Sequence, residues 1–457
     1  MYPKKELAQI VISACHQYQI DTVVISPGSR NAPLTVGFSN HTAFKTMSVV
    51  DERCAAFFAL GIAQQTKKPV AILCSSGSAM LNYYPAIAEA FYSNIPLVVI
   101  SADRPKHLID IGDGQTIRQE NVFKNHILFS ANLIEDSAKK EFNINLISEA
   151  LQKVNSKKGP VHINVPFDEP LYETVDEMED FLLPNLASNV VEKSPIDFQY
   201  FSEIWNSSAK KMILVGTNYP NMQLQAILNE FEKDTSVIIL TESTSNIAAE
   251  YTINSIDKLI FPFTETEFNA FKPEVLITFG GMVVSKKIKQ LLRNQQPKHH
   301  WHIDALNAMN TYHCLTEYIQ ESPVDFLPKL LEDKSVKSDY QQKWLSEKEK
   351  RSVKHAAYIG KIEFSDLKAF ESVLESIPEN SQLQLSNSSV VRYAQLFDIN
   401  NTLSEYFDFV PFCPEVDIGL GIPREAIRLV LIDEKVHCVG SKTVDLDVTQ
   451  QLKESAK

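Results

Sequence analysis

The sequence lacks the cysteine spacing that marks disulfide frameworks and metal sites. Its 457 residues include six cysteines, and no two of them form a C-x-x-C pair. Scattered free thiols of this kind indicate a reducing compartment. Cys15, Cys54 and Cys74 fall in apolar segments, where we expect them to be small buried core residues. The cysteine pattern therefore predicts a cytoplasmic protein.

Long apolar runs and an excess of positive charge are also lacking. No segment approaches the roughly 18 consecutive apolar residues that a membrane-spanning helix needs, and the amino terminus has no uninterrupted apolar stretch of a secretion signal. The formal net charge of −13 argues against a broad basic face for nucleic acid. We expect neither a membrane nor a nucleic acid as partner, so any anionic ligand must be bound by a local group of Arg, Lys and backbone N–H groups.

Two kinds of site are disfavoured by motif. The segment VGTNYP follows a predicted strand but lacks the dinucleotide-binding motif G-x-G-x-x-G. His299, His300 and His302 lie around another predicted strand, and the alternation of side chains puts His300 and His302 on one face. We interpret these three as surface histidines rather than zinc ligands.

The sequence does contain a regular alternation of helix-like and strand-like segments in its first third. Residues 7–18 place their apolar side chains on one helical face, and helices are also predicted at 52–66 and 79–93. Between them lie short apolar runs that read as strands: TVVIS, TMSVV, PVAILC, IPLVVIS and VHINVP. Strands of this kind alternating with helices predict a parallel, doubly wound sheet.

A second α/β series follows an acidic linker at about 173–184. Its strands are predicted at 211–217, 236–242, 275–281 and 299–305, and the charged segment 333–357 is predicted to be a solvated helical connection. A third series begins with LQLSNSSVVRYAQLF, which again has the pattern of strand, Ser-rich loop and helix. The pattern therefore predicts a chain with more than one α/β domain.

Polar loops follow three of the first strands. They are Ser26–Arg30, Ser75–Ser78 and Ala102–Pro105, and the segment GDGQTIRQEN at 112–121 adds further polar side chains. Ligands of open α/β sheets bind beyond the carboxyl ends of the strands. Two of the loops deliver an arginine, which suits bidentate recognition of carboxylates. We expect a small, multiply anionic ligand at this edge, although either arginine alone could equally be a surface or capping residue.

Glu52 lies between the strand-like run TMSVV and the apolar helix at 52–66. An acid at a helix start has a structural explanation, since a carboxylate in the first turn complements the helix dipole. A glutamate at this sheet edge could also share a proton with a ring nitrogen of a bound ligand. Glu52 alone does not distinguish the two interpretations.

The surrounding motifs carry a specific resemblance. The run ISPGSRNAPLT…VDERCAAFFALG…SSGSAMLNYYPAIAEA…SADRP…GDGQTIRQENVF…GPVHINVPFDEPLY resembles the pyrimidine-binding domain of the SEPHCHC synthases (2-succinyl-5-enolpyruvyl-6-hydroxy-3-cyclohexene-1-carboxylate synthases) of menaquinone biosynthesis. The resemblance extends over about residues 2–397. It implies a homodimeric or homotetrameric transferase that uses thiamine diphosphate and Mg²⁺ to decarboxylate 2-oxoglutarate and add the product to isochorismate.

The resemblance also implies roles for particular residues. Glu52 would be the catalytic carboxylate that hydrogen-bonds the cofactor's aminopyrimidine, and the loop Ser75, Ser76, Gly77 and Ser78 would line that ring. The positions that match substrate contacts of the family are Ser29, Arg30, Arg104, Gln115, Lys286, Lys287, Ser388 and Arg392. Both substrates carry two carboxylates, in agreement with the arginine-bearing loops.

A domain organisation follows from the same resemblance. It implies a thiamine diphosphate-binding α/β fold with doubly wound parallel sheets. We expect a pyrimidine-binding domain at 1–185, a Rossmann-like middle domain at 195–335, and the start of a truncated diphosphate-binding domain at 358–398. The family's Mg²⁺ motif, G-D-G followed further along by Asn, has no match here, because Gly112-Asp113-Gly114 belongs to the substrate loop. We therefore assign no metal ligand.

Residues 399–457 resemble part of a different family, the cysteine-ligated iron–sulfur proteins related to thiouracil desulfidase. Cys413 matches one expected ligand, and Cys438 does not complete a set, so we assign no cluster. Two alternatives to an active synthase stay open: a truncated or fused chain that retains only partial substrate binding, and another decarboxylase of the thiamine superfamily.

Overall fold

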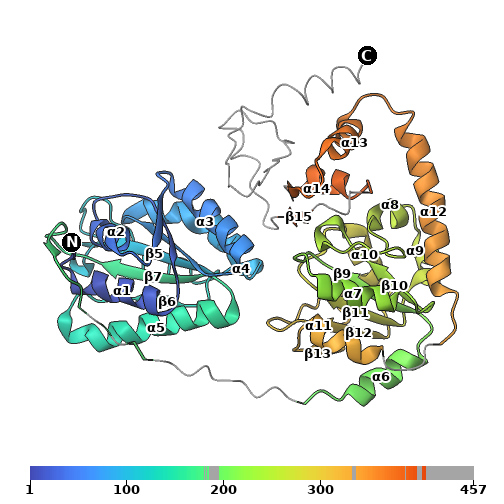
Figure 1. Ribbon diagram of the computed structural model, residues 1–457, viewed down its shortest axis with the longest axis horizontal. Helices are drawn as coiled ribbons and strands as arrows, with labels where there is room; N and C mark the ends of the chain where they lie inside the picture. Colours follow the sequence, from blue (N-terminus) through green and yellow to red (C-terminus); the bar gives the residue numbers. More distant parts are fainter. Residues whose placement is uncertain are drawn as a thin grey trace. The chain divides into compact units, whose positions relative to one another are not determined.

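The computed structural model describes residues 1–179, 181, 183–184, 195–331, 336–385 and 387–398, together with the backbone of 404–407 (Figure 1). The chain forms two compact units, one within Met1–Val191 and the other within Glu192–Lys457. Each unit is built around its own parallel sheet. No helix in the described ranges is long and apolar enough to cross a membrane.

Six parallel strands form the sheet of the first unit, in the order β3-β2-β4-β5-β7-β6. Their bounds are Thr22–Ile25 (β2), Lys45–Ser48 (β3), Val70–Cys74 (β4), Leu97–Asp103 (β5), Ser130–Asn132 (β6) and Val161–Pro166 (β7). Strands β4 and β5 are buried along their whole length, as expected where helices cover both faces. A small antiparallel pair, Tyr2–Pro3 (β1) and Thr174–Val175 (β8), joins the start of this unit to its end. The predicted doubly wound parallel sheet is confirmed.

Helices cover the two faces of this sheet. Helices α1 (Glu6–Gln17), α2 (Ala32–Asn40) and α5 (Lys140–Lys157) pack on one face, and α3 (Glu52–Thr66) and α4 (Tyr84–Tyr92) lie side by side on the other (Figure 1). Short 3₁₀ turns occur at Gly77–Tyr83 (η1), Lys106–Leu108 (η2) and Ser137–Lys139 (η3). Because α2 and α3 lie on opposite faces, the winding of the sheet reverses between β2 and β4.

Helix α3 has the bounds that the sequence predicts. At its start the Oδ1 atom of Asp51 accepts a hydrogen bond of 2.9 Å from the Cys54 amide, which is the usual role of an N-cap side chain. At its end Lys67 takes a left-handed conformation with φ 57°. Local capping therefore fixes both ends of the helix. The carboxylate that caps its first turn belongs to Asp51, not to Glu52.

The second unit has a five-stranded parallel sheet in the order β10-β9-β11-β12-β13. The strands are Lys211–Val215 (β9), Val237–Leu240 (β10), Val275–Phe279 (β11), His299–Ile303 (β12) and Glu317–Ile319 (β13). Helices α6 (Phe198–Ser207), α7 (Met222–Phe231), α11 (Pro323–Phe326) and η5 (Leu327–Leu330) cover one face. Helices α8 (Ile256–Ile260), α9 (Glu265–Phe271), α10 (Lys286–Asn294) and α12 (Tyr340–Ile359) cover the other. The winding here reverses between β9 and β11.

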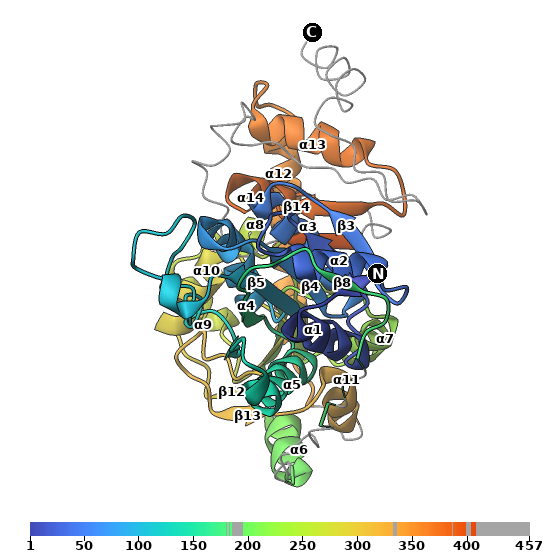
Figure 2. The same ribbon diagram turned by 90° about the vertical axis from the view of Figure 1, so that its left-hand side faces the viewer.

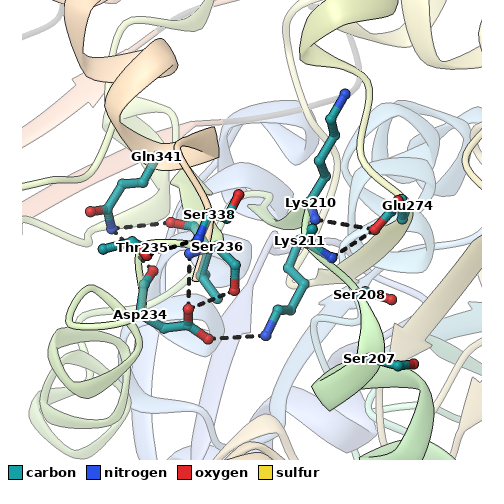
Figure 3. Close-up of polar contacts among 12 residues, drawn as sticks. Ser207, Ser208, Lys210, Lys211, Asp234, Thr235, Ser236, Glu274, Ser338 and Gln341 are labelled. Atoms are coloured by element: carbon teal, nitrogen blue, oxygen red, sulfur yellow. Dashed lines mark hydrogen bonds and ion pairs between the residues drawn. The ribbon is translucent and has the colours of Figure 1, made fainter. Parts of the chain in front are cut away.

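A polar cluster holds helix α12 to the amino end of this sheet (Figure 3). The ammonium of Lys211 is fully buried, 3.0 Å from Asp234 Oδ2 and 4.8 Å above the ring of Trp205. The other Asp234 oxygen accepts hydrogen bonds from the amide and hydroxyl of Ser236. From α12, the Gln341 side chain donates to the carbonyl of Val237 at 3.1 Å. Since these groups are paired with one another, we interpret the cluster as structural.

A third segment belongs to the second unit. It comprises α13 (Asp366–Ser376), β14 (Gln382–Leu385), α14 (Ser389–Ala394) and β15 (Ser404–Phe407), and the first three lie close together in Figure 2. Its apolar cluster includes Val284 from the loop before α10. Strands β14 and β15 pair in parallel, so one small sheet spans the predicted boundary at 398/399. The domain bounds at 1–185, 195–335, 358–398 and 399–457 stay predictions.

Two expectations about single side chains are wrong. His300 and His302 are buried rather than on the surface, and both hydrogen-bond the Thr278 hydroxyl, at 2.8 and 2.9 Å, from the neighbouring strand β11. They do share one face, as the alternation predicts. Cys54 is exposed, because it lies in the first turn of α3 on the side away from the sheet, whereas Cys15 and Cys74 are buried. The predicted helical connection near 333–357 is α12, whose first turns bury Tyr340 and Trp344.

Candidate functional site

Two of the predicted loops meet where the winding of the first sheet reverses. The loop after β2 approaches the loop after β4 so closely that a Cβ atom on Gly28 would lie 2.5 Å from Ser75 Cβ. The Asn31 side chain folds the first loop, accepting from the Gly28 amide and donating to the Ser26 carbonyl, both at 2.9 Å. Only glycine at position 28 permits this contact, and it places Ser29 and Arg30 beside the Ser75–Ser78 loop.

Gly77 is the second backbone position with a special requirement. Its φ is +87°, and a Cβ atom there would lie 3.0 Å from the Gln115 carbonyl oxygen, so the 112–116 loop lies directly over it. The Gly77 amide donates to Gln119 Oε1 at 2.7 Å. Gln119 is fully buried and donates in turn to the Ala102 carbonyl and to Asn164 Oδ1, at 3.1 and 2.9 Å. The buried Gln119 side chain therefore ties the loop after β4 to strands β5 and β7.

Ser76 provides an unused polar atom in this loop. The residue is 5 % exposed, and its hydroxyl has no hydrogen-bond partner. Buried polar atoms are nearly always paired, so such an atom at a sheet edge suits a ligand that would complete the pairing. Ser75 beside it is half-buried, and Ser78 is exposed. The loop thus offers groups at several depths to a bound ring.

The two predicted arginines lie at the same edge. Arg30 is buried and donates to the Phe167 carbonyl at 2.8 Å, and its second guanidinium nitrogen lies 3.2 Å from Glu169 Oε1. One guanidinium nitrogen of Arg104 is 3.6 Å from Asp113 Oδ2, and its Nε is buried without a partner. Burial and the positive charge of Arg104 lower the pKa of Arg30. Two guanidinium groups that influence one another therefore lie at this edge, each beside an acidic side chain, and guanidinium groups suit the recognition of carboxylates.

A buried polar network supports Arg104 from below. The Asp103 carboxylate accepts from the Arg104 amide at 2.7 Å and from Asn164 Nδ2 at 2.7 Å. Asn164 Oδ1 accepts from Ser101, whose hydroxyl also contacts His162 Nε2 at 2.8 Å. Burial raises the pKa of Asp103 to about 6 and lowers that of His162 to about 3. This network fixes the backbone from which the Arg104 side chain extends.

Glu52 is the first residue of α3 and is half-buried. The charge of Glu52 adds to burial in raising the pKa of Cys74 and Tyr83, which are both buried. Tyr83 reaches Ser26 Oγ at 3.4 Å, so Glu52 acts on groups near the place where the β2 and β4 loops meet. Asp51 caps the helix, and Glu52 lies in its first turn, where its charge also complements the helix dipole.

The remaining predicted residues lie in the second unit and are described with it. Lys286 and Lys287 begin α10, and Arg392 lies in α14, preceded by Ser388 with φ +79°. Lys289 lies within α10: burial lowers its pKa, and the charges of Arg293, Arg392 and Lys286 lower it further, so α14 is close to this helix. The structure thus groups the predicted residues into two sets, one at the carboxyl edge of the first sheet and one around α10 and α14.

A buried glutamate that the sequence analysis missed orders the start of α10. Glu242 accepts hydrogen bonds from the amides of Val284 and Ser285, at 2.6 and 2.7 Å, and burial raises its pKa to about 7. Ser285 caps α10 by accepting from the Ile288 amide at 3.1 Å. An acid directly after an apolar strand was the available signal. Asn164, a polar residue within a buried strand, was the corresponding signal in the first unit.

Within the described parts of the chain, no group of three or more His, Cys, Asp or Glu side chains could hold a metal ion. A cavity of about 330 Å³ lies beside Lys5, Glu135 and Pro170, and none of the predicted site residues lines it. Cys413 and Cys438 lie outside the described residues. The candidate site is therefore an open sheet edge with convergent polar groups.

Comparison with known proteins gives two family matches and many relatives. Residues 5–127 match the thiamine pyrophosphate enzyme N-terminal TPP binding domain, and residues 388–457 match 2-thiouracil desulfurase. A 2-succinyl-5-enolpyruvyl-6-hydroxy-3-cyclohexene-1-carboxylate synthase of Flavobacterium johnsoniae is 53 % identical over 410 residues, which are 89 % of this chain and 74 % of that protein. The proteins of the same name from Flavobacterium psychrophilum and Bacteroides thetaiotaomicron are 52 % and 36 % identical, over 89 % and 88 % of this chain and 74 % and 72 % of their own lengths.

Proposed function

The chain belongs to the family of 2-succinyl-5-enolpyruvyl-6-hydroxy-3-cyclohexene-1-carboxylate synthases, and from this premise we propose that it is a thiamine diphosphate-dependent transferase of menaquinone biosynthesis. Its substrates are then 2-oxoglutarate and isochorismate, both dicarboxylates. The observation that carries the proposal is the convergence of Glu52, the Ser75–Ser78 loop and two arginines at one sheet edge.

The pyrimidine end of thiamine diphosphate fits this edge. The unpartnered Ser76 hydroxyl and the close approach of the loops at Gly28 and Gly77 leave polar groups for a flat ring. When bound, the cofactor supplies the nucleophilic carbon that takes up a 2-oxo acid and lets it lose CO₂. The part of Glu52 is to hold a proton at a ring nitrogen of the aminopyrimidine, a task for which its half-buried position near Tyr83 is suited.

The arginines are proposed to orient the substrate carboxylates. Arg30 is fixed in direction by the Phe167 carbonyl, and Arg104 has a buried Nε that is left without a partner. Ser29 precedes Arg30 on the loop after β2, and Gln115 lies on the 112–116 loop, against Gly77. Lys286, Lys287, Ser388 and Arg392 are proposed as further contacts from the second unit. Mg²⁺, a homodimeric or homotetrameric state and a cytoplasmic location are proposed from the family and the composition alone.

Glu52→Gln tests the role of this acid. An amide cannot take the proton, so hydrogen exchange at the thiazolium C2 of added thiamine diphosphate should slow by about 10²- to 10⁴-fold, measured by NMR with Mg²⁺ present. The matched control is Asp51→Asn, which changes the neighbouring acid yet keeps a capping side chain. Normal exchange in Glu52→Gln, or equal loss in both variants, would remove Glu52 from the mechanism.

A second candidate function has its own observation. Residues 388–457 match 2-thiouracil desulfurase, and the predicted Mg²⁺ motif has no match in this sequence. A chain that binds dicarboxylates without turning them over is therefore the alternative. Measuring the circular-dichroism band of bound thiamine diphosphate, and then turnover of isochorismate with 2-oxoglutarate, separates the two. A cofactor band with normal turnover supports the synthase, and carboxylate binding without a band supports the alternative.

A further inference from the structure

Both arginines of the candidate site are paired with carboxylates of the chain itself. Arg30 lies 3.2 Å from Glu169, and Arg104 lies 3.6 Å from Asp113. Carboxylates are also what the two arginines are proposed to bind. Any substrate carboxylate must therefore compete with a carboxylate that is already part of the protein.

The two pairs differ in how firmly the arginine is held. The Arg30 side chain is 6 % exposed and keeps a hydrogen bond to the Phe167 carbonyl whatever Glu169 does. Arg104 is 23 % exposed, and its buried Nε has no partner. At 3.6 Å the contact with Asp113 is an ion pair longer than a good hydrogen bond. Arg104 thus has an incomplete set of partners that a better-placed carboxylate could complete.

The loop that carries Asp113 has room to move this side chain. Gly112, with φ +85°, and Gly114 flank it, and at neither glycine would an added Cβ meet another atom within 4 Å. The loop is held further on, where the Thr116 hydroxyl donates to the Asp113 carbonyl at 2.9 Å and Gln115 lies against Gly77. The Asp113 carboxylate can therefore leave Arg104 without disturbing the Ser75–Ser78 loop.

We infer that Asp113 is an internal counter-ion, which neutralises Arg104 in the ligand-free protein and is displaced when a substrate carboxylate binds. The inference rests on the proposed function and adds a residue that sets substrate affinity. It accounts for how two guanidinium groups lie at one edge without a ligand. The charge of Arg104 lowers the pKa of Arg30, whereas the charges of Glu169, Asp168 and Asp113 raise it. Removing the Asp113 charge should then tighten ligand binding, the opposite of what loss of an ordinary contact residue does.

Calorimetric titration with 2-oxoglutarate, without cofactor so that nothing turns over, tests this inference. Asp113→Asn should lower the dissociation constant about two- to fivefold, the range of a partly exposed ion pair. The matched control is Asp110→Asn on the same loop, since Asp110 pairs with the exposed Arg118, at 2.9 Å. It removes the same formal charge and should leave the constant unchanged.

A double-mutant cycle identifies the partner. In an Arg104→Ala background, Asp113→Asn should no longer tighten binding, because the competing pair is gone. The inference is overturned by an unchanged or weakened affinity in Asp113→Asn, by an equal effect of Asp110→Asn, by tightening that persists without Arg104, or by no binding to either protein. The proposed function is judged separately by the C2 exchange measurement, which involves neither Asp113 nor Arg104.

Discussion

The two sheets of this chain have the same pattern of winding, but the loops at their carboxyl edges differ. The first sheet reverses its winding between β2 and β4, and the second between β9 and β11, with glycine-containing loops at both places. Topology alone marks each reversal as a place where a ligand could bind. In the first sheet the loops present Ser76, Arg30 and Arg104, with buried donor atoms left unpaired. A ligand that is bound at that edge could pair with the Ser76 hydroxyl and the Arg104 Nε.

At the second sheet the point of reversal itself is filled by backbone, although Ser243 Oγ, Thr244 Oγ1 and His302 Nε2 are also buried there without a partner. The Gly281 amide donates to the Thr217 carbonyl at 2.7 Å, so the loop after β11 bonds to the loop after β9. The cavity beside His302 has a volume of about 20 Å³, which has room for roughly one water molecule. The comparison indicates that the reversal of winding marks a place where a ligand could bind. The side chains and the packing of the loops then decide whether a ligand fits there.

The largest expected effect is on stability, from a substitution at Gly216, where the loops of the second sheet touch. A Cβ atom on Gly216 would lie 1.9 Å from the Gly281 carbonyl oxygen, and both are backbone positions that cannot move aside cheaply. Gly216→Ala should therefore lower the free energy of unfolding of the second unit by about 3 kcal/mol, the upper end for overpacking. The three tryptophans, Trp205, Trp301 and Trp344, all lie in this unit, so urea unfolding followed by tryptophan fluorescence reports on it alone.

The control for this change is Gly61→Ala in α3 of the first unit. No atom lies within 4 Å of the added Cβ, and alanine favours a helix over glycine by about 1 kcal/mol. It should leave the tryptophan transition where it is. A Gly216→Ala protein as stable as the parent would mean that the second edge is not closed by this contact.

The next effect, on binding, belongs to the open edge. Arg104→Ala removes a charge-assisted contact and should weaken 2-oxoglutarate binding by about 1.5–3 kcal/mol, with no shift of the tryptophan transition. Arg104→Lys should recover only part of this, because lysine lacks the planar fork of donors. Equal affinity for all three proteins, measured by calorimetry, would show that the arginine is a surface feature.

The smallest expected effect is a change with pH in the free energy of unfolding, caused by the buried Asp103 beneath the first edge. Burial raises the pKa of Asp103 to about 6, above the ~4 of an unfolded chain, so the folded state holds this proton more tightly. The stability it contributes is present below pH ~4 and is lost as the pH rises through 6. Asn does not titrate, so the stability of Asp103→Asn relative to the parent should rise over this range by roughly 1–2 kcal/mol.

Unfolding of the first unit at several pH values, followed by hydrogen exchange, measures this difference. The buried His162 titrates in both proteins, so its contribution cancels. A difference that stays constant from pH 4 to 7 would contradict the raised pKa. Any fixed offset from the new amide leaves the slope with pH unaffected.

The sequence predicts the long, periodic elements of the fold well. Helix α3 has the predicted bounds because a capping acid and an apolar face act together within 15 residues. Strands β6 and β13 were missed, since three residues are too few for a period to be recognised. The histidines at 300 and 302 were misplaced because their partner, Thr278, is distant in sequence and adjacent only in the sheet.

The candidate site divides in the same way. Its loops could be predicted, because glycine and polar residues after apolar strands are local signals. The Gln119–Asn164–Asp103 network and the ion pairs of Arg30 and Arg104 could not, because each joins residues from loops and strands whose contact only the folded sheet creates. The roles of the predicted residues stay predictions until ligands are added.

The most direct test of the contrast between the two edges is NMR of ¹⁵N-glycine-labelled protein. The chain has 14 glycines, which include Gly77 and Gly112 at the first edge and Gly216, Gly280 and Gly281 at the second. Thiamine diphosphate should shift the Gly77 amide and leave the three glycines of the second edge unmoved, and 2-oxoglutarate should shift the Gly112 amide. Shifts confined to Gly216, Gly280 and Gly281 would contradict the account, because the ligand would then occupy the edge that it describes as closed.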